Sequence, residues 1–117
     1  MPLSSLTYHV LLALADADRH GYGIIKEIEA RAGRGAAPST GALYLALQRL
    51  ETDGWIAESP DRPDPDQDDA RRRYYRLTAA GRRAAQLETR RLAALVGIAV
   101  EKHLVPGAVV PGGQARQ

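Results

Sequence analysis

The sequence has no cysteine and no phenylalanine, and it has a single tryptophan. The absence of cysteine excludes disulfide bonds, thiolate metal sites and cysteine nucleophiles. Because large aromatic side chains are scarce, we expect a core of leucine, isoleucine, valine and alanine. No apolar run reaches the length of a membrane span, and the first residues lack the basic region of a secretory signal. We therefore expect a cytoplasmic protein with no membrane partner.

Patterns for catalysis and metal binding are also missing. The histidines are His9, His20 and His103, and no two of them have a spacing typical of metal ligands. No serine or aspartate stands in a nucleophile-elbow context. The run Gly21–Gly23 lacks the rest of a phosphate-binding loop, so it is better explained as a helix start that needs small residues for close packing. We expect no enzyme activity and no cofactor, and we predict that His20 caps a helix or binds the backbone.

Charge is nearly balanced overall but unevenly distributed. The formal net charge is +2 over 117 residues, a length that suits one domain. Residues 61–69 form an acidic run, whereas residues 71–91 are strongly basic, with Glu88 as their only acid. This asymmetry is compatible with a surface that binds a polyanion, and it is equally compatible with an ordinary solvated surface.

Three helices are predicted in the first half of the chain. The first begins at a cap on Ser4 or Ser5 and ends near Ala15, because apolar residues recur there at helical spacing. After a polar turn at residues 16–19, the second begins near Gly21 and stops at the glycines 33 and 35. The third is capped by Ser39 and ends at Gly54.

Two strands and a long helix follow. Residues 55–58 and 72–77 are expected to pair as a hairpin around the Pro/Asp-rich loop 60–69, with Trp55 closing the core beside it. Thr78 caps a last helix that runs to about Leu104 and is about 40 Å long at 1.5 Å per residue. The predicted fold is mainly α (α+β), a winged helix-turn-helix with a two-stranded wing. We expect a winged-helix domain over 1–78, a C-terminal helix over 79–105 and a disordered tail over 106–117.

The third helix has a mixed polar face. Leu43, Leu47 and Leu50 are expected to point inward, so the opposite side presents other residues to solvent. Hydroxyls and free amides near the start of this helix suit phosphate, while glutamine and arginine further along suit adenine and guanine edges. Leu45 fits less well: it either contacts thymine methyls or packs against a neighbouring loop. The outward residues are Thr40, Gly41, Tyr44, Leu45, Gln48 and Arg49.

Four segments, taken in order, make the sequence resemble the PadR-like family of transcription regulators. Residues 4–8 lead into an apolar helix, and residues 20–24 are similar to that family's HGYG-type start of the second helix. Residues 39–56 are similar to its recognition helix, and residues 72–82 resemble its second wing strand and the start of its last helix. The likeness extends over roughly residues 3 to 95.

The resemblance implies a homodimer that binds an inverted-repeat operator in double-stranded DNA, usually a repressor released by a small apolar or phenolic effector or by another signal. The short C-terminal region resembles the branch with a single dimerisation helix. That helix would pair with its counterpart and pack on the partner's first helix. Its own broad apolar arc also favours a second subunit. The expected dimer contacts are Leu6, Val10, Leu87, Leu92, Leu95 and Ile98.

Some residues depart from the family pattern. Ala42 stands where the family often has threonine, and Leu45 where it often has proline. The acidic wing tip would repel phosphate, so we expect only the arginines at its base to reach DNA. Tyr22 is expected either to touch a phosphate or to pack on the first helix. The expected DNA contacts are Tyr22, Ser39, Thr40, Gly41, Tyr44, Gln48, Arg49, Arg71, Arg72 and Arg73.

Two other functions remain open from the sequence. The acidic loop and the low net charge favour a winged-helix protein-interaction module without specific DNA binding. A dimer whose main event is the capture of a small ligand is also compatible, although the scarcity of aromatic residues argues against a cage for a flat ligand.

Overall fold

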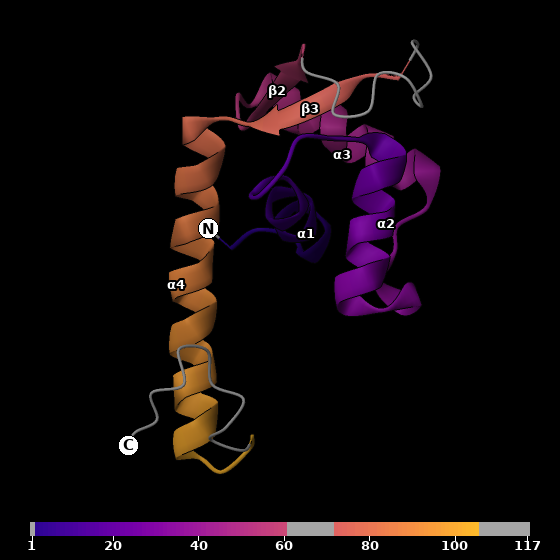
Figure 1. Ribbon diagram of the computed structural model, residues 1–117. Coiled ribbons are helices and arrows are strands. Elements are labelled where there is room, and N and C mark those ends of the chain that lie inside the picture. The colour runs from indigo at the N-terminus through magenta and orange to yellow at the C-terminus, as the bar shows by residue number, and fades with distance from the viewer. Residues whose placement is uncertain (1, 61–71, 106–117) are drawn as a thin grey trace.

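The computed structural model describes residues 2–60 and 72–105, so the acidic loop, Arg71 and the expected tail lie outside the described part. In Figure 1 the shorter helices lie beneath a small sheet, and the long last helix lies beside them. The elements are α1 Ser5–Leu14, β1 Arg19–His20, α2 Gly21–Ala32, a 3-10 turn Arg34–Ala36, α3 Thr40–Thr52, β2 Ile56–Ser59, β3 Tyr74–Leu77 and α4 Ala79–Glu101.

Each α-helix of the described chain begins at a side chain that caps it. The capping atom accepts a hydrogen bond of 3.0–3.1 Å from a backbone N–H three residues further on. The predicted caps on α1, α2, α3 and α4 are thus confirmed. They are Ser4, His20, Ser39 and Thr78. α4 ends at Glu101, slightly earlier than expected.

The core is aliphatic, as the composition predicts. Residues from α1, α2, α3 and the sheet form one buried cluster, and Trp55 packs against its edge. Leu43, Leu47 and Leu50 are the buried residues of α3, which confirms the predicted inward face of that helix. The cluster consists of Val10, Leu11, Ala13, Leu14, Ile24, Ile28, Leu43, Leu47, Leu50, Ile56 and Tyr75.

The sheet contains one strand more than expected. β2 and β3 form the predicted antiparallel hairpin, with Ile56 opposite Leu77 and Ser59 opposite Tyr74. β1 pairs with the other edge of β3, so β3 is the middle strand. The polar turn expected at residues 16–19 is therefore wrong at Arg19, which lies in β1. β1 has two residues, which is too short to give an alternating pattern.

The long helix α4 is fastened to the domain by its first half. The Tyr8 hydroxyl lies 2.6 Å from the Thr89 hydroxyl, and the Arg82 guanidinium donates to the carbonyl oxygen of Ala15 at 3.0 Å. Beyond these contacts α4 extends away from the other helices (Figure 1). Its second half therefore has a side that its own domain does not cover.

A buried carboxylate holds the segment before α1 against α4. Glu88 is only 4% exposed, and its Oε2 lies 2.6 Å from Nη2 of Arg91. The hydrogen bond from Arg91 lowers the pKa of Glu88, and a hydrogen bond from the Leu3 backbone acts in the same direction. Glu88 is thus ionised and paired, which explains how an acid occurs in this basic stretch.

Candidate nucleic-acid interface

The outward face of α3 is uncovered. All six residues predicted to face outward are exposed, and so is the Ser39 cap. A Cβ built on Gly41 meets no atom within 4 Å, so the first turn of α3 can approach another surface closely. Hydroxyls, an amide and a guanidinium share this face with Leu45, which makes the face suitable for the polar edges of nucleic acid.

A second set of groups lies at the start of α2. Tyr22 is 53% exposed, and two cations lie near its ring: Lys26 Nζ at 5.4 Å and the Arg72 guanidinium carbon at 6.0 Å. Arg72 Nη1 also lies 3.0 Å from Nε2 of His20, which stacks on Tyr22. The structure thus brings Arg72 of the wing to the start of α2. We call Tyr22, Lys26 and Arg72 the aromatic–cation cluster.

Lys26 is not among the contacts expected from the sequence, and the structure places its amine beside the ring of Tyr22. Its hydrogen bond to Tyr22 and its proximity to Glu29 raise the pKa of Lys26, so the amine stays charged. The sequence signal that could have identified Lys26 is its distance along the chain from Tyr22. Lys26 follows Tyr22 by four residues, and such residues are neighbours on the surface of a helix.

The two helices meet through Tyr44 and Gly21. A Cβ added to Gly21 would lie 2.3 Å from the Tyr44 hydroxyl oxygen and 2.7 Å from the adjacent ring carbon. Glycine at this position therefore lets the ring of Tyr44 lie against the first turn of α2. This confirms the need for a small residue at Gly21 but not at Gly23, where a Cβ would meet its neighbours only at 3.5–3.6 Å, and it places the Tyr44 hydroxyl at the first turn of α2.

Arg73 does not join these groups. Its Nη2 lies 3.1 Å from a carboxylate oxygen of Glu51 at the end of α3, and 3.1 Å from one of Glu58 in β2. Its guanidinium also lies 5.3 Å from the ring centre of Tyr75. The expectation that Arg73 contacts phosphate is not supported by this arrangement, because both carboxylates already bind its charge. Arg73 instead ties α3 to the sheet.

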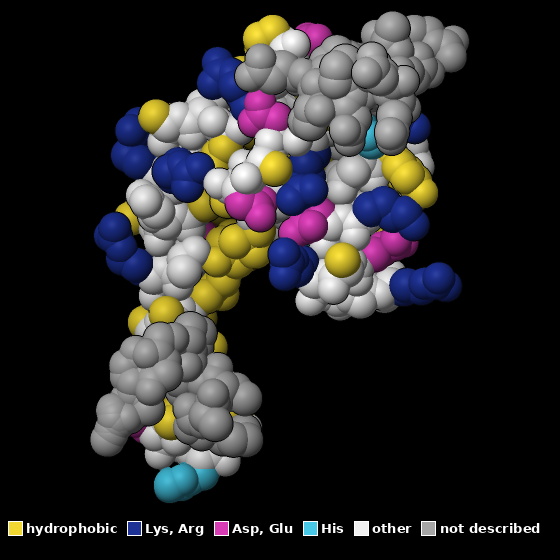
Figure 2. All heavy atoms as spheres, viewed as in Figure 1, with side chains coloured by type: hydrophobic (Ala, Val, Ile, Leu, Met, Phe, Trp, Pro, Cys, Tyr) yellow, Lys and Arg dark blue, Asp and Glu magenta, His cyan; other side chains and the backbone are white. Residues whose placement is uncertain are grey.

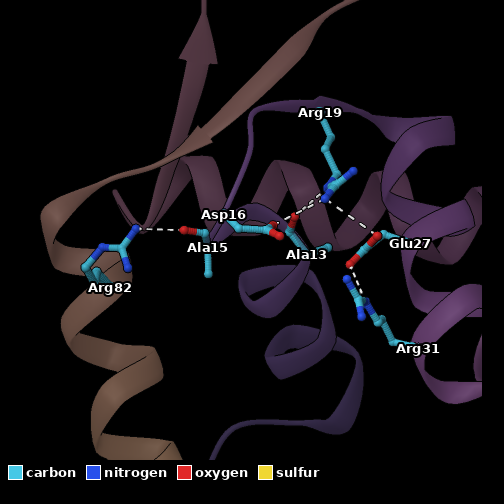
Figure 3. A network of polar contacts seen from close by, with 7 residues as sticks. All are labelled: Ala13, Ala15, Asp16, Arg19, Glu27, Arg31 and Arg82. Atoms are coloured by element: carbon cyan, nitrogen blue, oxygen red, sulfur yellow. Dashed lines mark hydrogen bonds and ion pairs between the residues drawn. The ribbon is translucent and has the colours of Figure 1, made fainter.

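Another set of ion pairs fixes α2 relative to α1 (Figure 3). The Arg19 Nε donates to the Ala13 carbonyl at 2.7 Å, and its Nη2 lies within 3.5 Å of both Asp16 and Glu27. Glu27 also accepts from Arg31 at 3.0 Å. These contacts join the end of α1 to the middle of α2.

All but one of the expected dimer contacts are at least partly exposed. Leu87, Leu95 and Ile98 are exposed on α4, and Leu6 and Leu92 are half-buried. Val10 is the exception, because it is fully buried in the core of its own subunit. The structure therefore removes Val10 from the set. Helical spacing alone placed Val10 beside Leu6, but it cannot tell a core face from a subunit contact when both are apolar.

Metal and membrane sites are not found in the part that the structure describes. Within residues 2–60 and 72–105, no three His, Asp or Glu side chains are grouped so that they could hold a metal ion. No helix in those ranges has the combination of length and apolarity that crossing a bilayer requires.

The helices α1, α2 and α3, the last of them exposed on its outer face, are followed by the hairpin of β2 and β3. This arrangement defines a winged helix-turn-helix protein. The family model described as the transcriptional regulator PadR-like family matches residues 10–87. The chain belongs to this family. It is thus a transcription regulator rather than an enzyme.

Two curated relatives each match 88 residues of the chain. A transcriptional regulator of Mycobacterium tuberculosis, Rv3488, is 37% identical over 88 residues, which are 75% of each chain. An uncharacterised 37.1 kDa protein from a transposon of Streptomyces fradiae is 39% identical over 88 residues, and the match spans 75% of this chain but 23% of that protein.

Solved structures share the fold. A PadR family transcription regulator from Clostridium difficile superposes with a TM-score of 0.68 at 23% identity, covering 84% of this chain and 97% of that one. Bacillus subtilis PadR, solved in complex with operator DNA, gives 0.60 at 20% identity, covering 71% of this chain and 45% of that one.

Proposed function

We propose that this protein is a homodimeric repressor that binds an inverted-repeat operator through α3. The observation that carries the proposal is the outward face of α3, which is exposed along its length and carries groups that suit phosphates and base edges. Bacillus subtilis PadR, which shares the fold, binds operator DNA. Two copies of α3 would enter successive major grooves about one helical turn apart.

The groups divide into two roles. Gln48 and Arg49 lie in the second half of α3, where they read bases. The hydroxyls of Thr40 and Tyr44, the amides at the start of α3 and the aromatic–cation cluster hold phosphates on either side. These phosphate contacts set the register but carry no sequence information themselves.

The second copy binds along α4. The exposed side chains of Leu87, Leu95 and Ile98 lie on a helix whose second half leaves its own domain. These three side chains form an exposed apolar arc on α4, and Figure 2 shows hydrophobic side chains gathered where α4 adjoins the rest of the domain. An apolar arc of this width is costly to leave in water, which favours a second subunit over solvent.

Release by an effector would act through the angle of α4. A hollow of about 390 Å³ lies where α4 crosses α1, with Leu12, Leu77 and Gln86 among its lining residues. A small apolar molecule seated there would shift α4 and so change the separation of the two α3 helices. That separation must match the spacing of the half-sites for both copies to bind at once.

The first test is a gel-shift titration with the upstream region of the protein's own gene. We expect saturable binding to that fragment, two chains per site, and much weaker binding to an unrelated duplex of equal length. The affinity should fall steeply with salt, because phosphate contacts release counterions. No preference for the upstream fragment over the unrelated duplex would instead favour the protein-interaction module.

Arg72 and Arg73 are expected to differ although they are adjacent. Arg72→Ala should weaken binding to every duplex and reduce the slope of log affinity against log salt by about 1 for each chain that makes the contact. Arg73→Ala should leave that slope nearly unchanged and lower the melting temperature, because Arg73 binds Glu51 and Glu58. Salt titrations and thermal melts of both variants measure this. An equal loss of slope in Arg73→Ala would show that its guanidinium leaves those carboxylates for phosphate.

A further inference from the structure

Leu45 points almost directly away from the core. At about 100° per residue, it lies within roughly 15° of the direction opposite the mean of Leu43, Leu47 and Leu50. The structure agrees, since the side chain of Leu45 is 62% exposed whereas those three are buried. Packing against a neighbouring loop of the described chain, which the sequence left open, would have buried it. When α3 enters a groove, this side chain therefore goes deepest.

The surroundings of Leu45 are not apolar. Gly41 lies one turn before it, and Gln48 and Arg49 lie one turn after it, all exposed. A protein partner would need a contiguous apolar patch around the leucine. Among the residues one turn away, Ala42 is the other exposed aliphatic residue, so this surface presents one large aliphatic side chain beside hydrogen-bonding groups.

We propose that Leu45 is a specificity-determining residue that reads the 5-methyl group of a thymine in the major groove. Leucine can neither donate nor accept a hydrogen bond, and the thymine methyl is the apolar group that the base pairs present in this groove. Gln48, one turn further on, suits the N6 and N7 atoms of adenine. Each half-site should therefore contain a thymine close to the base pair that Gln48 contacts.

This inference rests on the proposed operator binding, and its test begins by finding a bound duplex. The duplex is either the upstream fragment or a sequence selected from a randomised pool. It is prepared in two forms, one with thymine and one with uracil at the position that Leu45 is proposed to contact. Uracil keeps the hydrogen-bonding pattern and lacks the methyl. Burying a group of methylene size contributes about 0.8 kcal/mol, so wild type should bind the uracil duplex about fourfold more weakly per half-site and roughly fifteenfold more weakly over two.

The variant Leu45→Ala should bind thymine and uracil duplexes with nearly equal affinity, because it has no side chain left to meet the methyl. Leu104→Ala is the matched control: Leu104 is also an exposed leucine, it lies beyond α4, and its replacement should leave the thymine preference intact. Competition titrations at one salt concentration give both ratios. A cytosine replaced by 5-methylcytosine at the same step should restore part of the affinity in wild type only.

The outcomes separate the two proposals. If a specific duplex is bound but wild type does not distinguish thymine from uracil, the role of Leu45 is wrong and operator binding stands. The role is equally wrong if Leu45→Ala keeps the full preference. A changed oligomeric state in Leu45→Ala, with no thymine effect, would assign the leucine to a contact with a second copy. If no duplex is preferred at all, operator binding itself fails, and the inference fails with it.

Discussion

Gly81→Ala is expected to destabilise the domain by about 3 kcal/mol, the upper end of what overpacking usually costs. A Cβ at this position would lie 2.0 Å from the carbonyl oxygen of Trp55 and 2.9 Å from its carbonyl carbon. The Trp55 carbonyl cannot easily move away, because its oxygen also accepts a hydrogen bond from the Thr78 backbone N–H at 3.1 Å. The first turn of α4 must then shift. Because Thr78 also caps α4, the shift would break this cap.

Thermal and denaturant unfolding measure this effect. A loss of that size lowers the melting temperature of a small domain by roughly 15 °C. Gly35→Ala is the control, because a Cβ there meets nothing within 4 Å and the residue lies in the turn after α2. It should be neutral or slightly stabilising, since alanine reduces the conformational freedom of the unfolded chain. Equal melting temperatures for the two variants would mean that α4 does not press on the Trp55 carbonyl.

The helices were predictable because two independent signals agree at each of them. In α3, the spacing of Leu43, Leu47 and Leu50 and the cap at Ser39 give the same start and the same buried face. The outward face then follows from helical geometry alone. β1 gave no such signal. Arg19 and His20 become a strand only because β3 offers a free edge at Tyr74 and Tyr75, which is a property of the assembled sheet.

The same limit explains where the site differs from expectation. Arg72 and Arg73 are neighbours in one basic run, and only the fold shows that Glu51 and Glu58 converge on Arg73. The sequence predicts phosphate contacts for both arginines, because a run of basic residues does not show which carboxylates lie beside each of them in the fold. Val10 was misplaced for a related reason, since an apolar position says that a residue is buried but not by which subunit.

Gly21→Ala is expected to weaken operator binding about tenfold while changing stability little. The added Cβ would overlap the hydroxyl and outer ring of Tyr44, which are the movable end of a half-exposed side chain. The ring would therefore swing away and remove one phosphate contact, and hydrogen bonds to charged groups contribute about 1.5–3 kcal/mol. Fold stability should be preserved because no backbone atom is struck. Affinity titrations beside thermal melts separate the two effects.

The companion variant Tyr44→Ala makes this prediction sharper. If the glycine matters only because it leaves room for the ring, Gly21→Ala should cost nothing further once the ring is gone, and the two losses should not add. Gly23→Ala is the matched control in the same turn of α2. A Cβ there would meet His20 and Arg19 at the ordinary contact distances of 3.5–3.6 Å, so operator affinity should be unchanged. Additive losses would show that Gly21 acts on DNA independently of Tyr44, for example through the backbone at the start of α2.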